Sequence, residues 1–110
     1  MLGVTTPRVM ANTFEDGLRA ALGRACQAQN TAVITQGRRE ILAMSRDAVL
    51  QSIERIAADA LPLNDEWEFR GLLEVYEQLD RGLLRRLVES GLASDNEEIK
   101  EAALDFRDRV

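Results

Sequence analysis

Histidine is absent from this chain of 110 residues, and cysteine occurs once, at Cys26. Without histidine, the Ser-His-Asp and Cys-His arrangements that activate a nucleophile cannot form, and the commonest zinc ligand is missing. A single cysteine can form neither an internal disulfide nor a multi-cysteine metal site. An enzyme would have to work with carboxylates, arginines and hydroxyls alone, so we expect a protein without catalysis.

Glycine-rich phosphate loops and long apolar runs are missing as well. Neither the GxxxxGK[ST] pattern nor the GxGxxG pattern occurs, and we expect no bound cofactor and no metal. No apolar stretch approaches the roughly 18 residues that cross a bilayer, which predicts no membrane span. Residues 1–13 lack the basic and apolar segments of a signal peptide. We therefore expect a cytoplasmic location.

Negative charge is concentrated in the second half of the chain. Residues 1–50 carry six arginines and four acids, a net charge of +2, whereas residues 51–110 carry eight basic and fifteen acidic residues, a net charge of −7. A nucleic-acid backbone is bound by clustered positive charge, so nucleic acid is not the expected partner. The acids either solvate outer helix faces or attract a protein partner with a basic surface.

Apolar residues recur at helical spacing along most of the chain. This periodicity predicts helices from residue 13, over residues 45–60, from residue 64 or 65 to residue 79, over residues 81–90, and from residue 95 onward. Asp65-x-x-Glu68 and the two overlapping patterns Ser94-x-x-Glu97 and Asp95-x-x-Glu98 all fit a capping box. Gly91 follows the fourth helix, where a glycine in the left-handed conformation commonly ends a helix.

Residues 30–37 form the ambiguous segment. Thr31-Ala32-Val33-Ile34-Thr35 is rich in β-branched residues, but the sequence offers no second strand with which it could pair. We interpret residues 30–37 as a connector or an irregular helix start, followed by one or two helical turns over residues 38–44.

The fold class that follows is all-α. We expect a compact bundle of five to six short antiparallel helices, because the predicted connections are only two to five residues long. Residues 13–110 form a single all-α domain, and residues 1–12 are predicted to be a flexible N-terminal tail. Cys26 lies beside the apolar face of the first helix and is expected to be a small buried residue rather than a reactive thiol.

Residues 95–103, Asp-Asn-Glu-Glu-Ile-Lys-Glu-Ala-Ala, resemble the second helix of a HEAT repeat. In that family an acidic turn is followed by a β-branched residue, a basic residue and small residues that allow close helix stacking. With residues 82–91 as the first helix, residues 82–107 resemble one HEAT-like helical hairpin. A solenoid requires about three repeats, and the sequence contains no second copy of this motif.

A second resemblance leads to a different function. Leu87 to Gly91, followed by Ala93-Ser94 and residues 97–102, resembles the helix-turn-helix core of ribbon-helix-helix antitoxins, with one residue deleted. That resemblance implies a small DNA-binding transcriptional regulator, whose DNA-reading strand precedes the first helix. Residues 74–80 instead have helical period and acidic character, so we keep this function as the alternative.

Trp67 is the only tryptophan, and it lies nearly opposite the apolar face of its predicted helix. Glu74 shares its side, and Arg70 lies one turn away. Trp67 either folds back onto Leu61 or Leu63 or anchors a partner, since Trp and Arg dominate interface hot spots. We therefore expect Trp67, Arg70 and Glu74 to bind a protein partner, with homodimerisation as a further possibility.

The remaining charged clusters carry less information. The pairs Arg38-Arg39 and Arg85-Arg86 are expected to be solvated, because adjacent helical residues point about 100° apart. The carboxylates at predicted helix starts are explained by capping and by the helix dipole. The function that the sequence favours is protein–protein interaction, in an adaptor or a regulatory and neutralising role.

Overall fold

The computed structural model describes residues 13–110, which contain six α-helices and no strand. The helices are α2 (Thr13–Gln27), α3 (Thr31–Ala43), α4 (Arg46–Ala60), α5 (Glu66–Leu79), α6 (Arg81–Leu92) and α7 (Glu97–Phe106), followed by the short 3-10 helix η2 (Arg107–Arg109). The predicted all-α bundle of five to six helices is confirmed. The tail predicted for residues 1–12 lies outside the described residues.

The structure corrects the prediction for residues 30–37, which belong to the regular helix α3. Asn30 is its N-cap, and the side-chain oxygen accepts hydrogen bonds from the backbone N–H groups of Ala32 and Val33, at 2.8 and 3.3 Å. These bonds satisfy amide groups that have no partner inside the helix. The β-branched composition was therefore a weaker signal than the capping asparagine, and the expected connector was wrong.

The start of α7 also differs from the expectation. Asn96 is the N-cap and accepts hydrogen bonds from the N–H groups of Glu98 and Ile99, at 2.9 and 3.3 Å. Ser94 instead accepts a bond from the Asn96 N–H, so neither Ser94 nor Asp95 caps the helix. The cap predicted at Asp65 is correct, because its carboxylate accepts from the Glu68 N–H at 3.1 Å.

Gly91 does not end a helix in the left-handed conformation. It lies inside α6, and none of the described glycines has a positive φ. A Cβ at this position would come within 2.7 Å of both the Ala103 Cβ and the Phe69 Cζ. The glycine is therefore explained by the close contact of α6 with α7 and α5, and the predicted C′ role was wrong.

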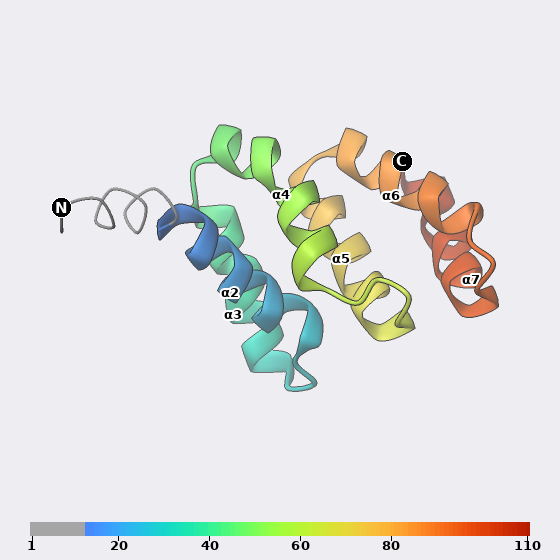
Figure 1. Cartoon of the computed structure of the whole chain (residues 1–110), viewed down its shortest axis with the longest axis horizontal. Helices are drawn as coiled ribbons and strands as arrows, with labels where there is room; N and C mark the ends of the chain where they lie inside the picture. The colour runs from blue at the N-terminus through green and yellow to red at the C-terminus, as the bar shows by residue number, and fades with distance from the viewer. Residues whose placement is uncertain (1–12) are drawn as a thin grey trace, which may run out of the picture.

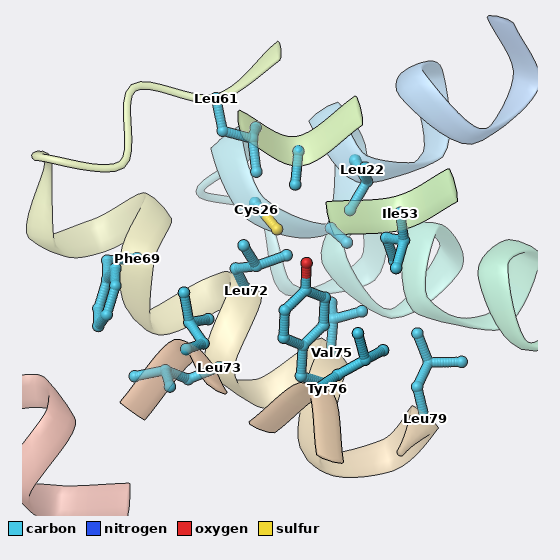
Figure 2. Packing of buried hydrophobic residues seen from close by; sticks show 14 of the residues in the cluster. Leu22, Cys26, Ile53, Leu61, Phe69, Leu72, Leu73, Val75, Tyr76 and Leu79 are labelled. Atoms are coloured by element: carbon cyan, nitrogen blue, oxygen red, sulfur yellow. The ribbon is translucent and has the colours of Figure 1, made fainter. Parts of the chain in front are cut away.

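The core lies between helices that are not all neighbours in the sequence. α2 packs against α3, α4 and α5, and α5 in turn packs against α6 and α7, whereas α4 lies closer to α2 than to α5. Leu22 of α2, Ile53 of α4 and Leu72 of α5 converge on this interior, as Figure 2 shows. In the described part of the chain every buried side chain of the core is hydrophobic, including Cys26 and Tyr76.

In chain order the helices group as α2–α3, α4–α5 and α6–α7, but only the first and the last group are closely packed pairs, because α4 packs mainly against α2. Their first helices begin at residues 13, 46 and 81, so the groups are offset by 33 and 35 residues. Figure 1 shows the groups following one another in chain order, from α2 and α3 at one end to α6 and α7 at the other. The first helices of the three groups thus begin at similar intervals along the chain, although α4 and α5 do not pack together as the other two groups do.

Ion pairs join corresponding helices of successive groups in two rows. The row of first helices, α2, α4 and α6, is joined by Arg19–Asp59, Arg55–Glu15 and Arg86–Glu54. The row of second helices, α3, α5 and α7 with η2, is joined by Arg38–Glu74, Arg70–Asp105 and Arg109–Glu77. The second row carries the candidate site.

Candidate functional site

The structure brings Trp67, Arg70 and Glu74 together along one side of a cleft of about 170 Å³. Their spacing of three and four residues places them on one face of α5, which is the reason the sequence could group them. The opposite wall is formed by Ile34 and Arg38 of α3, and the floor by residues at the end of α2. The cleft, which we call the α5 cleft, therefore lies where three helices meet.

Trp67 stands at the edge of the α5 cleft with 52% of its surface exposed. Its indole Nε1 donates a hydrogen bond to the backbone carbonyl of Ala28, at 3.1 Å, in the connection between α2 and α3. The ring is thus held by a bond to another part of the fold while much of it faces solvent. Its hydrogen bond goes to this connection and not to the segment around Leu61 and Leu63.

Arg38 pairs with Glu74 across the cleft, so the expectation that Arg38 is simply solvated was wrong. The Arg38 side chain is 25% exposed, and its Nε atom is buried and has no hydrogen-bond partner in the described part of the chain. A buried N–H without a partner costs free energy. The bond to Glu74 and the packing of the side chain therefore have to offset this cost. Arg38 is the residue of this site that sequence reasoning missed.

Arg70 bonds two carboxylates, one on its own helix and one on α7, through one guanidinium group. Its Nε donates to Glu66 at 2.7 Å within α5, and one terminal nitrogen lies 2.8 Å from the carboxylate of Asp105 on α7. The hydrogen bond to Glu66 is the main cause that raises the pKa of Arg70, and the bond to Asp105 adds to it. Arg70 is therefore fixed in place at the rim, with both of these donor positions occupied.

The floor of the α5 cleft is apolar and closely packed. Ala25 and Cys26 of α2 lie there beside Gly71 of α5, and a Cβ at Gly71 would come within 3.0 Å of the Cys26 Cα. Burial raises the pKa of the Cys26 thiol from 9.0 to about 12. The thiol is therefore neutral and poorly nucleophilic near neutral pH, as expected for a buried small residue.

Both arginines of the α5 cleft are paired with carboxylates. Arg38, Arg70 and Glu74 are the charged residues that line this cleft, and the two guanidinium groups form ion pairs with Glu74, Glu66 and Asp105. The carboxylates are also more exposed than the arginines they pair with: 46% for Glu74 against 25% for Arg38, and 52% for Asp105 against 31% for Arg70. In these two pairs the carboxylate is therefore the more exposed partner.

A second cleft of about 180 Å³ is lined by residues of α4, α5 and α6. Tyr76 lines it with its side chain 2% exposed, and burial raises the pKa of its hydroxyl group. Arg86 and Glu54 join α6 to α4 across this cleft through a two-pronged ion pair with distances of 2.8 and 3.1 Å. The ion pair leaves no unpaired charge among the groups of this cleft that could bind a charged ligand.

Two features bear on the classes of function considered from the sequence. Among residues 13–110, no helix is long and apolar enough to cross a membrane, and no three acidic or cysteine side chains are grouped in a way that could hold a metal ion. Residues 74–79, where the antitoxin resemblance would require a strand, belong to α5.

No family model matches the chain, and comparisons with curated proteins and with solved structures also give no match.

Proposed function

We propose that this protein is a protein-interaction module without catalysis of its own, acting as an adaptor or as a regulatory and neutralising partner. The observation that carries the proposal is the half-exposed Trp67, held by its bond to Ala28 at the edge of a cleft. A fixed aromatic side chain beside a cavity is the typical form of an interface anchor. Such an anchor has little rotamer freedom left to lose when a partner binds.

The row of second helices gives this anchor an extended surrounding surface. Stacked helix pairs bind partners along such rows, because each pair adds one more helix to a continuous face. The resemblance of residues 82–107 to a HEAT-like hairpin agrees with this mode of binding. We place the interaction in the cytoplasm, and a second copy of the chain is one of the partners that the test below can reveal.

A small DNA-binding regulator of the antitoxin type is the alternative function. It would need a strand ahead of the helices that resemble the antitoxin core, and the residues at that position lie in α5. The net charge of −7 over residues 51–110 also opposes contact with phosphates. A gel-shift assay with bulk DNA at low salt tests this alternative, and tight, salt-sensitive binding would favour it over the interaction module.

The test of the proposal compares Trp67→Ala with Leu104→Ala. Leu104 is the matched control, because it is another large exposed apolar residue, 46% exposed, on α7. Each tagged variant is used to capture proteins from cells that make this chain, with quantitative mass spectrometry and crosslinking to locate the contact. We expect one partner that is crosslinked near the α5 cleft and lost with Trp67→Ala but retained with Leu104→Ala.

Stability measurements separate binding from packing in the same variants. Trp67→Ala removes one hydrogen bond and a half-buried ring, so its unfolding free energy should fall by about 1–2 kcal/mol. A loss of about 3–5 kcal/mol, as for a buried aromatic residue, would show that Trp67 mainly holds the fold together. That result, or a set of captured proteins unchanged by Trp67→Ala, would refute the proposed function.

A further inference from the structure

We infer that the α5 cleft receives the last residue of a partner chain, with its apolar side chain on the floor and its terminal carboxylate against the arginines of the walls. This inference rests on the proposed function and names the group of the partner that the site binds. The cleft has three features that such a chain end requires: a positive lining, guanidinium nitrogens that have no acceptor, and an apolar floor.

The residues that line the cleft favour an anionic group. In the described part of the chain, the charged residues among them are Arg38, Arg70 and Glu74, so two arginines and one glutamate give a net charge of +1. Glu66 and Asp105, which pair with Arg70, do not line the cleft. A negative charge that enters the cleft therefore meets more positive than negative charge on its walls.

Both arginines keep nitrogens that have no acceptor in the described part of the chain. The Nε of Arg38 is buried without a hydrogen-bond partner, and only one of its terminal nitrogens bonds to Glu74. In Arg70 the Nε and one terminal nitrogen bond to Glu66 and Asp105, whereas the second terminal nitrogen has no partner. A carboxylate between the two side chains can accept from both free terminal nitrogens, and its charge stabilises the neighbouring Nε of Arg38.

The floor decides which kind of carboxylate fits. It consists of Ala25, Cys26 and Gly71, and burial raises the pKa of the Cys26 thiol, because a negative charge is poorly stabilised there. An aspartate or glutamate side chain carries its charge at the tip and would bring that charge onto the floor. A chain end instead carries its carboxylate and its side chain on the same carbon atom. An apolar side chain can therefore fill the floor while the carboxylate stays at the walls.

The size of the cleft fits one residue of a protein. Its volume of about 170 Å³ is slightly larger than the cavity of roughly 150 Å³ that holds a benzene ring, so one leucine or phenylalanine side chain fits. Sites for small molecules commonly have volumes of about 300–1,000 Å³, which makes a free ligand the less suitable occupant. A chain end also adds only one negative charge, so the net charge of −7 over residues 51–110 can still attract a partner that is basic elsewhere.

The experiment follows the fluorescence of Trp67, which is the only tryptophan of the chain and lines the cleft. The probe is a Gly/Ser peptide that ends in leucine with a free carboxylate, and it is added to the whole chain of 110 residues. It is compared with the same peptide ending in leucine amide, with one ending in glycine, and with an amidated peptide that carries an internal glutamate. We expect a saturable change in emission with the free leucine end, and binding at least about tenfold weaker for the other three peptides.

Arg38→Gln removes one guanidinium group of the cleft. Arg39→Gln is the matched control, because the adjacent Arg39 is exposed on the same helix and does not line the cleft. Arg38→Gln should weaken binding of the peptide with the free leucine end about tenfold, as expected for lost hydrogen bonds between charged groups, and Arg39→Gln should leave it nearly unchanged. If Arg38→Gln, which leaves Glu74 unpaired, does not fold, Arg70→Gln provides a second variant with the same expected loss.

Equal binding of any of the three comparison peptides, or equal effects of Arg38→Gln and Arg39→Gln, would overturn the inference. No saturable response to the peptide with the free leucine end would overturn it as well. If a cellular partner still depends on Trp67 in that case, the proposed function stands and only the chemistry of the bound group is wrong. If the capture of partners is also independent of Trp67, both proposals fail.

Discussion

The contact of α3 with α2 leads to a sharp prediction for Gly37→Ala. Gly37 is buried in α3, and a Cβ there would lie 2.5 Å from the backbone nitrogen of Ala25 and 2.8 Å from the carbonyl oxygen of Ala21. Both atoms belong to the backbone of α2, so neither can move away by changing a side-chain rotamer. To restore an ordinary separation of about 3.4 Å, α3 must move by roughly 1 Å, which loosens a close-packed interface.

The size of the effect follows from two opposing contributions. Alanine stabilises a helix interior by about 1 kcal/mol relative to glycine. Overpacking costs about 1–3 kcal/mol, and the rigid backbone contact at Gly37 places this site at the upper end. We therefore expect Gly37→Ala to lower the free energy of unfolding by about 2 kcal/mol, which corresponds to a fall in Tm of about 8–16 °C for a domain of this size.

Gly17→Ala is the matched control on the other helix of the same pair. Gly17 is exposed in α2, and a Cβ there would meet only the end of the Met44 side chain, at 4.0 Å. This variant should gain the helix contribution alone, about 1 kcal/mol, and melt about 4–8 °C higher than the parent chain. Urea and thermal unfolding followed by circular dichroism measure both variants, and a Gly37→Ala protein at least as stable as the parent would refute the described contact of α3 with α2.

The remaining predictions concern a helix cap, the core and the buried thiol. Asn96→Ala should lower the free energy of unfolding by about 1 kcal/mol, whereas Asp95→Ala should change it by much less, because only Asn96 caps α7. Equal losses for the two variants in urea titrations would contradict this prediction. Ile53→Ala, at a fully buried site, should cost about 2–5 kcal/mol, while Leu42→Ala, at a site 50% exposed, should stay within about 0.5 kcal/mol, and similar losses in the same titrations would contradict the described core. Burial raises the pKa of Cys26 from 9.0 to about 12, so its contribution to stability is complete below pH 9.0 and is lost as the pH rises towards 12, by about 1.4 kcal/mol per pH unit. The unfolding free energy should therefore fall less between pH 7 and pH 10 in Cys26→Ala than in the parent chain. Equal falls in the two proteins would contradict this origin.

The positions of most helices could be predicted because their signals are local. Apolar residues at helical spacing and the capping carboxylate of Asp65 lie within a few residues of the structure they determine. For α3 a local signal also existed in Asn30, but the β-branched residues Val33 and Ile34 outweighed it in the interpretation. The error came from giving composition more weight than the cap.

Gly91 illustrates information that the neighbouring sequence does not contain. The glycine is required by Ala103, which lies one helix later, and by Phe69, which lies one helix earlier. A glycine near the end of a predicted helix fits both a C′ position and a close helix contact, and only the packing of three helices distinguishes the two. Sequence reasoning therefore assigned the commoner of the two roles.

The candidate site was likewise only partly predictable from the sequence. Trp67, Arg70 and Glu74 could be grouped from the sequence, because their spacing alone places them on one side of α5. The opposite wall and the floor come from α2 and α3, about 30 to 50 residues earlier in the chain. From the sequence we therefore expected Arg38 to be solvated, whereas in the structure it forms an ion pair with Glu74.

Ion pairing also changes what the net charge of the chain means. Eight of the fifteen acids in residues 51–110 form ion pairs with other residues of the range 13–110, so the charge of −7 does not describe a uniformly attractive surface. At the α5 cleft, Glu74 and Asp105 are more exposed than the arginines with which they pair, so a neutralised pair can still present oxygen atoms to solvent. This difference in exposure is set by the fold, and no count of charges along the sequence could reveal it.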